Sequence, residues 1–305
     1  MSASTEVPRR LTVADIARRY ADGLRLPMLT AYDYPTAQLL DRAGIPLILV
    51  GDSLGQVLLG YESTVRVTMA EMLHHTKAVV RGTQRALVIG DMPFLTYAAV
   101  DEALDNAGRF LQEAGAQAVK VEGGVRSARI IEGLVRAGIP VMGHIGWTPQ
   151  AQHGMGGKVR VQGRTREQAR SMLADALAVQ EAGAFSIVLE LLPEQLAGAI
   201  TERLRIPTIG IGAGPGCSGQ VQVITDLLGL GDFVPRHARR YAELGAVIER
   251  AVRAYAADVE AGTFPAAAET VRMDDEVLDA VLGRGIHDRP AGSIPVGGIP
   301  LDRDL

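Results

Sequence analysis

Acidic residues end three short, mostly apolar runs in the first half of the chain. Asp52, Asp91 and Glu122 each stand at the end of such a run, and runs of this kind are typical of strands that are buried on both faces of a parallel sheet. The three acids lie 39 and 31 residues apart, and one strand–helix–strand unit takes about 30 or more residues. We therefore expect three consecutive strands to deliver one carboxylate each to the same end of one sheet.

Carboxylates that meet in this way suit a hard divalent cation such as Mg²⁺, which takes oxygen ligands and usually keeps some water or substrate oxygens. The cation would offset the mutual repulsion that otherwise raises the pKa values of neighbouring carboxyl groups. An acid at a strand end also commonly caps the next helix, and this alternative stays open for each residue taken alone. Recurrence in three successive units favours a metal site formed by Asp52, Asp91 and Glu122.

Two further polar residues accompany these acids. Lys120 and Glu122 alternate with valines along one run, so both side chains point the same way, toward the interior of the fold. A buried lysine beside acids either binds an anion or forms a structural ion pair, and we favour anion binding. Ser53, directly after Asp52, brings a hydroxyl group to the same place.

Later runs bring two more candidates to the same end of the sheet. Glu190 ends the run that begins at Ser186, and a carboxylate there is our candidate general base, with a salt bridge as the alternative. His144 follows Gly143 at a predicted strand end, where a functional and a structural histidine are equally compatible with the sequence. The glycine-rich stretch 210–214 either cradles a phosphate or forms a close-packed turn.

The elements that position these residues alternate along the chain. Seven predicted helices follow predicted strands, at residues 35–43, 68–79, 100–114, 127–137, 166–182, 193–204 and 236–261. The predicted strands cover residues 27–31, 47–51, 86–90, 118–121, 140–144, 186–190, 207–211 and 220–224. Strict alternation implies a parallel sheet with right-handed crossovers. Eight such units close most naturally into a (β/α)8 TIM barrel, whose C-terminal strand ends carry the active site; a doubly wound open sheet is the alternative.

Composition excludes several classes of protein. The chain has 305 residues, 47% of them apolar, and a net charge of −4 with scattered basic residues, so we expect no binding to nucleic acid. Cys217 is the only cysteine, which excludes an intrachain disulfide and favours the reducing cytoplasm. Residues 1–10 lack the apolar core of a signal peptide, and no apolar run approaches the roughly 18–20 residues of a membrane span. We expect one barrel domain over residues 1–265 and an extended or partly disordered tail over residues 266–305.

Taken together, these residues resemble the ketopantoate hydroxymethyltransferase family. The resemblance covers roughly residues 11–265, and each stretch is weak alone but specific in combination. The matching stretches occur in the family's order: Leu29-Thr30-Ala31-Tyr32-Asp33, Val50-Gly51-Asp52-Ser53-Leu54-Gly55, Asp91-Met92-Pro93-Phe94, Val119-Lys120-Val121-Glu122-Gly123-Gly124, Gly143-His144-Ile145-Gly146, Thr148-Pro149-Gln150, Val161-Gln162-Gly163-Arg164, Val188-Leu189-Glu190 and Ile209-Gly210-Ile211-Gly212-Ala213-Gly214.

The resemblance implies a barrel of the phosphoenolpyruvate/pyruvate type that works in the cytoplasm in pantothenate biosynthesis, usually as a homo-oligomer and often as a decamer. It implies Mg²⁺ at Asp52, Asp91 and Glu122. Glu190 would act as proton acceptor. An α-keto acid would contact the side chains of Asp52, Ser53, Asp91 and Lys120, with His144 nearby.

The implied reaction fits the chemistry of these residues. Mg²⁺ would withdraw charge from the carbonyl of 3-methyl-2-oxobutanoate and acidify its C3 proton. Glu190 would remove that proton, and Lys120 would help to stabilise the enolate. The enolate would then attack the one-carbon unit of 5,10-methylenetetrahydrofolate, which is a co-substrate, and the products would be 2-dehydropantoate and tetrahydrofolate.

The sequence departs from the family's pattern in its loops. Residues 157–162 form a loop one residue longer than usual, Ser218 replaces an acid, Gln222 replaces a leucine, and residues 229–241 are shortened. Two other functions stay open. An isocitrate-lyase-like enzyme would also use Mg²⁺ on an α-keto acid, but a matching loop cysteine is missing. An inactive metabolite-binding barrel would not require the intact set of acids and lysine.

Overall fold

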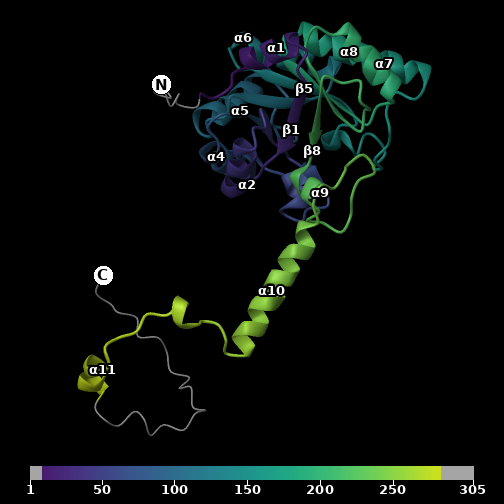
Figure 1. The fold of residues 1–305 in the computed structure, drawn as a ribbon. Coiled ribbons are helices and arrows are strands. Elements are labelled where there is room, and N and C mark those ends of the chain that lie inside the picture. The colour runs from purple at the N-terminus through teal and green to yellow at the C-terminus, as the bar shows by residue number, and fades with distance from the viewer. Residues whose placement is uncertain (1–8, 283–305) are drawn as a thin grey trace, which may run out of the picture. The chain divides into compact units, whose positions relative to one another are not determined.

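Eight parallel strands close into a barrel, and each strand pairs with the next along the chain until β8 pairs with β1 (Figure 1). The computed structural model describes residues 9–282. The strands are β1 (Leu26–Thr30), β2 (Leu47–Val50), β3 (Leu87–Asp91), β4 (Ala118–Glu122), β5 (Val141–Gly146), β6 (Ser186–Glu190), β7 (Thr208–Ile211) and β8 (Gly219–Gln222). The predicted (β/α)8 barrel is confirmed. The doubly wound alternative is wrong, because an open sheet has two edge strands, whereas here every strand pairs with a neighbour on both sides.

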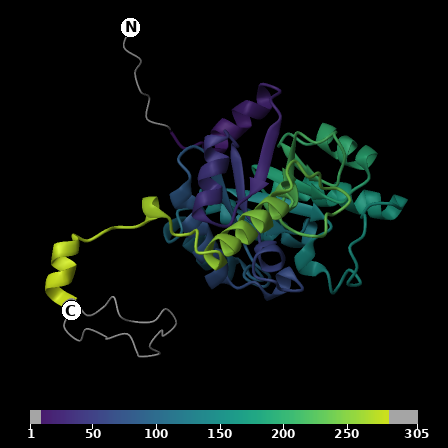
Figure 2. The same ribbon diagram turned by 60° about the horizontal axis from the view of Figure 1, so that its bottom comes forward.

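Helices follow most of the strands and surround the barrel (Figures 1 and 2). Those of the barrel are α1 (Val13–Ala21), α2 (Tyr34–Arg42), α3 (Leu54–Val57), α4 (Met69–Gly82), α5 (Val100–Gln112), α6 (Ala128–Arg136), α7 (Arg166–Glu181), α8 (Glu194–Arg203) and α9 (Ile224–Leu228). They are followed by α10 (Leu244–Glu260) and α11 (Asp275–Leu282). Short 3₁₀ helices cover Thr64–Arg66, Val125–Ser127, Pro149–Ala151 and Ala267–Glu269.

Side-chain caps fix where several helices begin. The Thr12 hydroxyl accepts a hydrogen bond from the Asp15 backbone N–H, while the Asp15 carboxylate accepts one from the Thr12 backbone N–H. This reciprocal pair is a capping box. Thr68 and Glu71 form the same pair at the start of α4. Both caps satisfy backbone donors that have no partner within the helix.

The interior of the barrel is apolar over most of its depth. Outward positions such as Val88 and Val119 belong to a second core under the helices, as expected from the two-residue period of a strand. Ile16 of α1 packs against the inward side chains of the strands. All eight strands contribute to this inner cluster, with Leu26, Met28, Leu47, Leu49, Leu87, Ile89, Ala118, Met142, Val188, Ile209 and Val221. The last inward positions of the strands therefore decide what lies at the C-terminal end of the barrel.

The helix predicted from residue 236 begins eight residues later, at Leu244. The reason is that backbone N–H groups before Leu244 donate hydrogen bonds to other elements instead of to the carbonyl groups of a preceding helical turn. The Arg239 backbone N–H donates to the Gln222 side-chain oxygen at 2.7 Å, and the Tyr241 backbone N–H donates to the Leu227 carbonyl oxygen at 2.8 Å. The short helices α3 and α9 were not predicted.

The chain divides into two compact units, Met1–Gly245 and Ala246–Leu305. The first holds the barrel. The second, over its described residues, holds most of α10 and all of α11, with exposed side chains throughout. Within the predicted tail, residues 275–282 form α11, whereas residues 1–8 and the chain from residue 283 lie outside the described residues. The domain boundary at residue 265 and the extended or partly disordered tail stay predictions. No helix in residues 9–282 is both long and apolar enough to span a bilayer.

Candidate active site

The structure brings all the predicted site residues to the C-terminal ends of five neighbouring strands. Strand pairing places Asp91 of β3 beside Lys120 of β4, and Glu122 of β4 beside His144 of β5. Most of these side chains are buried, which is unusual for charged groups, whereas Glu190 at the end of β6 keeps 16% of its side chain exposed. The remaining two, Asp52 and Ser53, follow β2 directly, with Asp52 buried and Ser53 half-buried.

Lys120 provides the positive charge that balances the buried acids. Its Nζ atom lies 2.8 Å from Asp91 Oδ1 and 3.9 Å from Glu122 Oε1. Burial alone would lower the pKa of Lys120, but the charges of Asp91 and Glu122 outweigh it and raise this pKa. Lys120 is therefore held as a cation, and the structure shows the ion pair that was one of its two predicted roles.

His144 lies between two carboxylates. Its Nδ1 atom is 3.3 Å from Glu122 Oε1 and 3.2 Å from Lys120 Nζ, and its Nε2 atom is 3.2 Å from Glu190 Oε2. The Nε2 contact is close but poorly aligned for a hydrogen bond. Burial and Lys120 lower the pKa of His144, but Glu122 and Glu190 outweigh them and raise it to about 9. The imidazole thus connects the buried acids to the partly exposed Glu190.

Burial sets the protonation of the three acids. It raises the pKa of Asp52 well above the ordinary value, and the charges of Asp91 and Glu122 add to this effect. Burial also raises the pKa of Asp91 against the opposing charge of Lys120. For Glu122 the same burial is outweighed by His144 and Lys120, which lower its pKa. A cation bound among these carboxylates would favour their ionised forms.

The donor atoms fit the predicted divalent cation. Asp91 Oδ1 and Glu122 Oε1 are buried and contact Lys120 and His144, and carboxylate oxygens are the ligands that Mg²⁺ prefers. Within residues 9–282, however, no three acidic, histidine or cysteine side chains already stand in the arrangement of a metal centre. Ligation by Asp52, Asp91 and Glu122 would therefore require movements of their side chains.

Three further side chains at the site were not predicted as site residues. The Tyr32 hydroxyl lies 2.9 Å from Ser53 Oγ and fixes that hydroxyl beside Asp52. Gln150 and Tyr97 form a hydrogen-bonded pair next to the acids. The stretch Thr148-Pro149-Gln150 was noted only as part of the family resemblance, and this was the one signal for Gln150.

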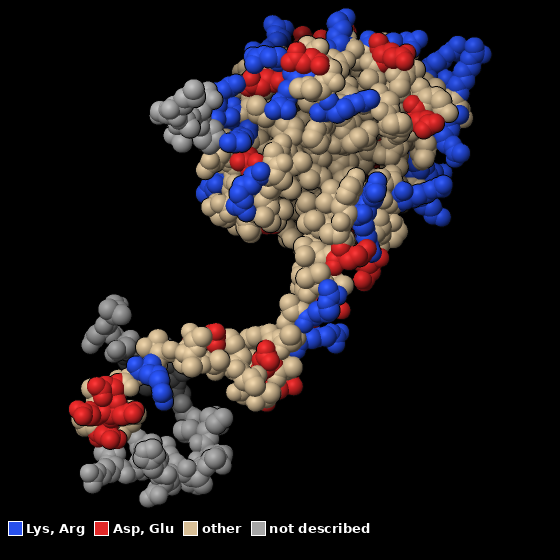
Figure 3. Space-filling model, viewed as in Figure 1, with Lys and Arg blue, Asp and Glu red and all other residues tan. Residues whose placement is uncertain are grey.

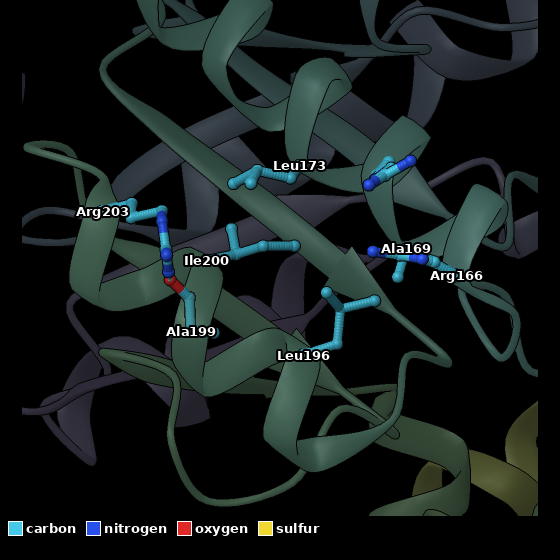
Figure 4. A pocket seen from close by; sticks show the side chains of 8 residues that line it. Arg166, Ala169, Leu173, Leu196, Ala199, Ile200 and Arg203 are labelled. Atoms are coloured by element: carbon cyan, nitrogen blue, oxygen red, sulfur yellow. Dashed lines mark hydrogen bonds between the residues drawn. The ribbon is translucent and has the colours of Figure 1, made fainter.

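A surface hollow lies outside the barrel, between α7 and α8 (Figure 4). It has a volume of about 260 Å³ and an apolar floor that includes Leu173, Leu196 and Ile200. Arginines 166, 170 and 203 line it, and basic side chains stand out around these helices in Figure 3. Long arginine side chains commonly cover apolar seams of this kind with their methylene groups, so the hollow is explained by helix packing.

Comparisons with known proteins show the family and the fold of the chain. A family model described as ketopantoate hydroxymethyltransferase matches residues 10–267. The chain is 66% identical over 275 residues to the 3-methyl-2-oxobutanoate hydroxymethyltransferase of Chloroflexus aurantiacus, covering 90% of this chain and 97% of that protein. It is 54% identical to the enzyme of the same name from Gluconacetobacter diazotrophicus, covering 90% and 99%.

Solved structures share the fold at low sequence identity. Phosphonopyruvate hydrolase in complex with oxalate and magnesium aligns with a TM-score of 0.57 and 13% identity, over 90% of this chain and 99% of that one. 2,3-Dimethylmalate lyase, a member of the PEP mutase/isocitrate lyase superfamily, aligns with a TM-score of 0.54 and 15% identity, over 90% and 96%. These likenesses show the barrel fold alone.

Proposed function

We propose that this chain transfers a hydroxymethyl group to 3-methyl-2-oxobutanoate and forms 2-dehydropantoate in pantothenate biosynthesis. The chain belongs to the ketopantoate hydroxymethyltransferase family, and this membership is the premise of the proposal. The donor would be 5,10-methylenetetrahydrofolate. The observation that carries this proposal is the buried set of acids and Lys120 at the C-terminal end of the barrel, with the partly exposed Glu190 at its edge. Such a set suits removal of a proton next to a carbonyl group.

The site residues divide into a binding group and a proton acceptor. Asp52, Asp91 and Glu122 would hold Mg²⁺, which supplies polarisation of the substrate carbonyl when it is bound. Lys120, fixed as a cation by Asp91, would stabilise negative charge that develops on the substrate oxygen. Ser53, held by Tyr32, would donate a hydrogen bond to the α-keto acid.

Glu190 would take the proton from C3 of the substrate. It is the exposed member of the set, so substrate can approach its carboxylate without displacing the buried ion pairs. His144 lies against it through Nε2 and would orient the carboxylate toward the substrate. The enolate that remains would attack the one-carbon unit of the folate.

The other expectations stay proposals of the same kind. A cytoplasmic location and assembly into homo-oligomers, of ten copies by the family resemblance, are supported by family membership alone. An effect of the altered loops 157–162 and 229–241 on folate binding is likewise a proposal.

An isocitrate-lyase-like function is not favoured. Such an enzyme would use a reactive cysteine in a loop near the substrate, but Cys217 is buried. The thiol also packs tightly against β7, because a Cβ atom added at Gly210 would lie only 3.0 Å from Cys217 Sγ. Burial also raises the pKa of the Cys217 thiol, which opposes the thiolate form that a nucleophile needs.

The test is turnover of the full chain with 3-methyl-2-oxobutanoate and 5,10-methylenetetrahydrofolate, in Mg²⁺ and in excess chelator. We expect formation of 2-dehydropantoate in Mg²⁺ and its loss with the chelator, followed by recovery when Mg²⁺ is restored. A folded protein that forms no product in Mg²⁺ would overturn the proposal.

A further inference from the structure

Gln150 connects parts of the site that come from distant stretches of the chain. It lies in the 3₁₀ helix Pro149–Ala151 after β5 and is 4% exposed. Its side-chain Nε2 atom donates to Asp52 Oδ2 and to the Met92 carbonyl oxygen, both at 2.9 Å. These two acceptors use both hydrogens of the amide nitrogen.

The amide of Gln150 has one favourable orientation. Tyr97 donates its hydroxyl hydrogen to Gln150 Oε1, and burial raises the pKa of Tyr97, so that this donor stays protonated. A flipped amide would place Oε1 against the Asp52 carboxylate and the Met92 carbonyl, and in the ionised form of Asp52 that binds a cation, three acceptors would then meet without a hydrogen. The polar groups around the amide therefore determine which atom faces Asp52.

The backbone of the same residue contacts a second acid. The Gln150 backbone N–H donates to Glu122 Oε2 at 3.1 Å. One residue thus holds a carboxylate that follows β2 and another that ends β4. The two contacts can be separated by mutation, because substitution of the side chain leaves the backbone N–H in place.

We infer that Gln150 is a positioning residue, which holds Asp52 beside Glu122 and thereby sets the affinity of the site for a divalent cation. This inference rests on the proposed function, in which both acids are metal ligands. Asp52 stands close to Asp91, whose Oδ2 atom already accepts a hydrogen bond from the Asp52 backbone N–H. Without the amide donor, repulsion between these buried acids would turn the Asp52 carboxylate away from the common centre.

The test compares two buried glutamines. Gln150→Met keeps the length of the side chain and removes its hydrogen bonds. Gln180→Met is the matched control, since Gln180 is 7% exposed and its amide bonds to the Arg205 backbone N–H and to Glu181, outside the barrel interior. Binding of Mn²⁺ would be measured by electron paramagnetic resonance and binding of Mg²⁺ by calorimetry, together with the thermal midpoint of each variant.

We expect the dissociation constants of Gln150→Met to rise roughly 10- to 100-fold, the usual effect of removing a residue that orients a metal ligand. Gln180→Met should bind both cations as the wild type does. At saturating Mg²⁺ the kcat of Gln150→Met should return toward the wild-type value, which the loss of a catalytic group would not allow. Tyr97→Phe should shift the dissociation constants in the same direction by a smaller factor.

Asp52→Asn separates failure of this inference from failure of the proposed function. If Asp52→Asn weakens cation binding but Gln150→Met does not, Gln150 has no positioning role. Equal weakening in Gln150→Met and Gln180→Met would show a general effect of lost stability and would also overturn the inference. If the wild type binds neither cation, or if Asp52→Asn binds as tightly as the wild type, the metal site of the proposed function is itself wrong.

Discussion

The inward side chains of the barrel change character within one step along β3, β4, β5 and β6. In β3, Leu87 and Ile89 lie in the apolar interior, and the next inward residue is Asp91. In β5 the same step leads from Met142 to His144. The apolar layer and the charged layer therefore share one backbone, one register and one alternation of side chains.

The difference between the two layers separates stability from chemistry. Burial of apolar side chains stabilises the fold with no requirement for exact partners, whereas buried charges need partners and often add little net stability. A layer of charged side chains that is buried inside a barrel is thus a sign of function. The variants below test this division, in order of expected effect.

The largest effect is expected for Glu190→Gln. The amide keeps the shape of the side chain but cannot accept a proton, so kcat should fall about 10²- to 10⁴-fold, the usual contribution of a general base. The free energy of unfolding should change little because the side chain is partly exposed. Steady-state kinetics and urea denaturation give the two values, and unchanged kcat would show that Glu190 is not the base.

Lys120→Met should affect both properties. It leaves Asp91 buried without its cation at 2.8 Å, and breaking a buried pair in this way destabilises a protein by about 3–5 kcal/mol. Activity should be lost as well. Denaturation of the variant, alone and combined with Asp91→Asn, measures the ion pair. If Asp91→Asn restores none of the lost stability, the two charges are not coupled.

Ile89→Ala tests the apolar layer one step below Asp91. Ile89 is fully buried, and its truncation should lower the free energy of unfolding by about 2–5 kcal/mol. The kcat of the folded fraction should stay close to that of the wild type, which distinguishes this layer from the charged one. A large loss of kcat at full folding would mean that the two layers are not separable.

The smallest effects are expected at the N-terminal cap of α1. Thr12→Ala removes a helix cap and should cost about 1 kcal/mol of stability. The Arg9 side chain and the bonds from Thr12 hold the pKa of Asp15 well below its ordinary value. The stabilisation is therefore present above the ordinary carboxyl pKa and is lost as the pH falls. Asp15→Asn should flatten this part of the acid-denaturation curve, and an unchanged curve would contradict the role of Asp15.

The sequence predicts the barrel and the charged strand ends well, because both depend on local patterns. Apolar runs with acids at their ends can be recognised without knowing what lies opposite them, as for Asp52 and Asp91. Gln150 could not be found in this way, since its partner Asp52 lies 98 residues away and glutamine is common in loops. The start of α10 was misplaced for a related reason, because Gln222 and Leu227 bond to backbone groups that a local pattern assigns to a helix.

The central claim is that the charged layer removes the C3 proton of the substrate. The most direct test is exchange of that proton with deuterium, followed by NMR in D₂O without folate, in the wild type and in Glu190→Gln. We expect exchange in the wild type that requires Mg²⁺ and that falls by the same factor as kcat in the variant. Exchange that is absent from the folded wild-type protein, or equally fast in Glu190→Gln, would contradict the claim.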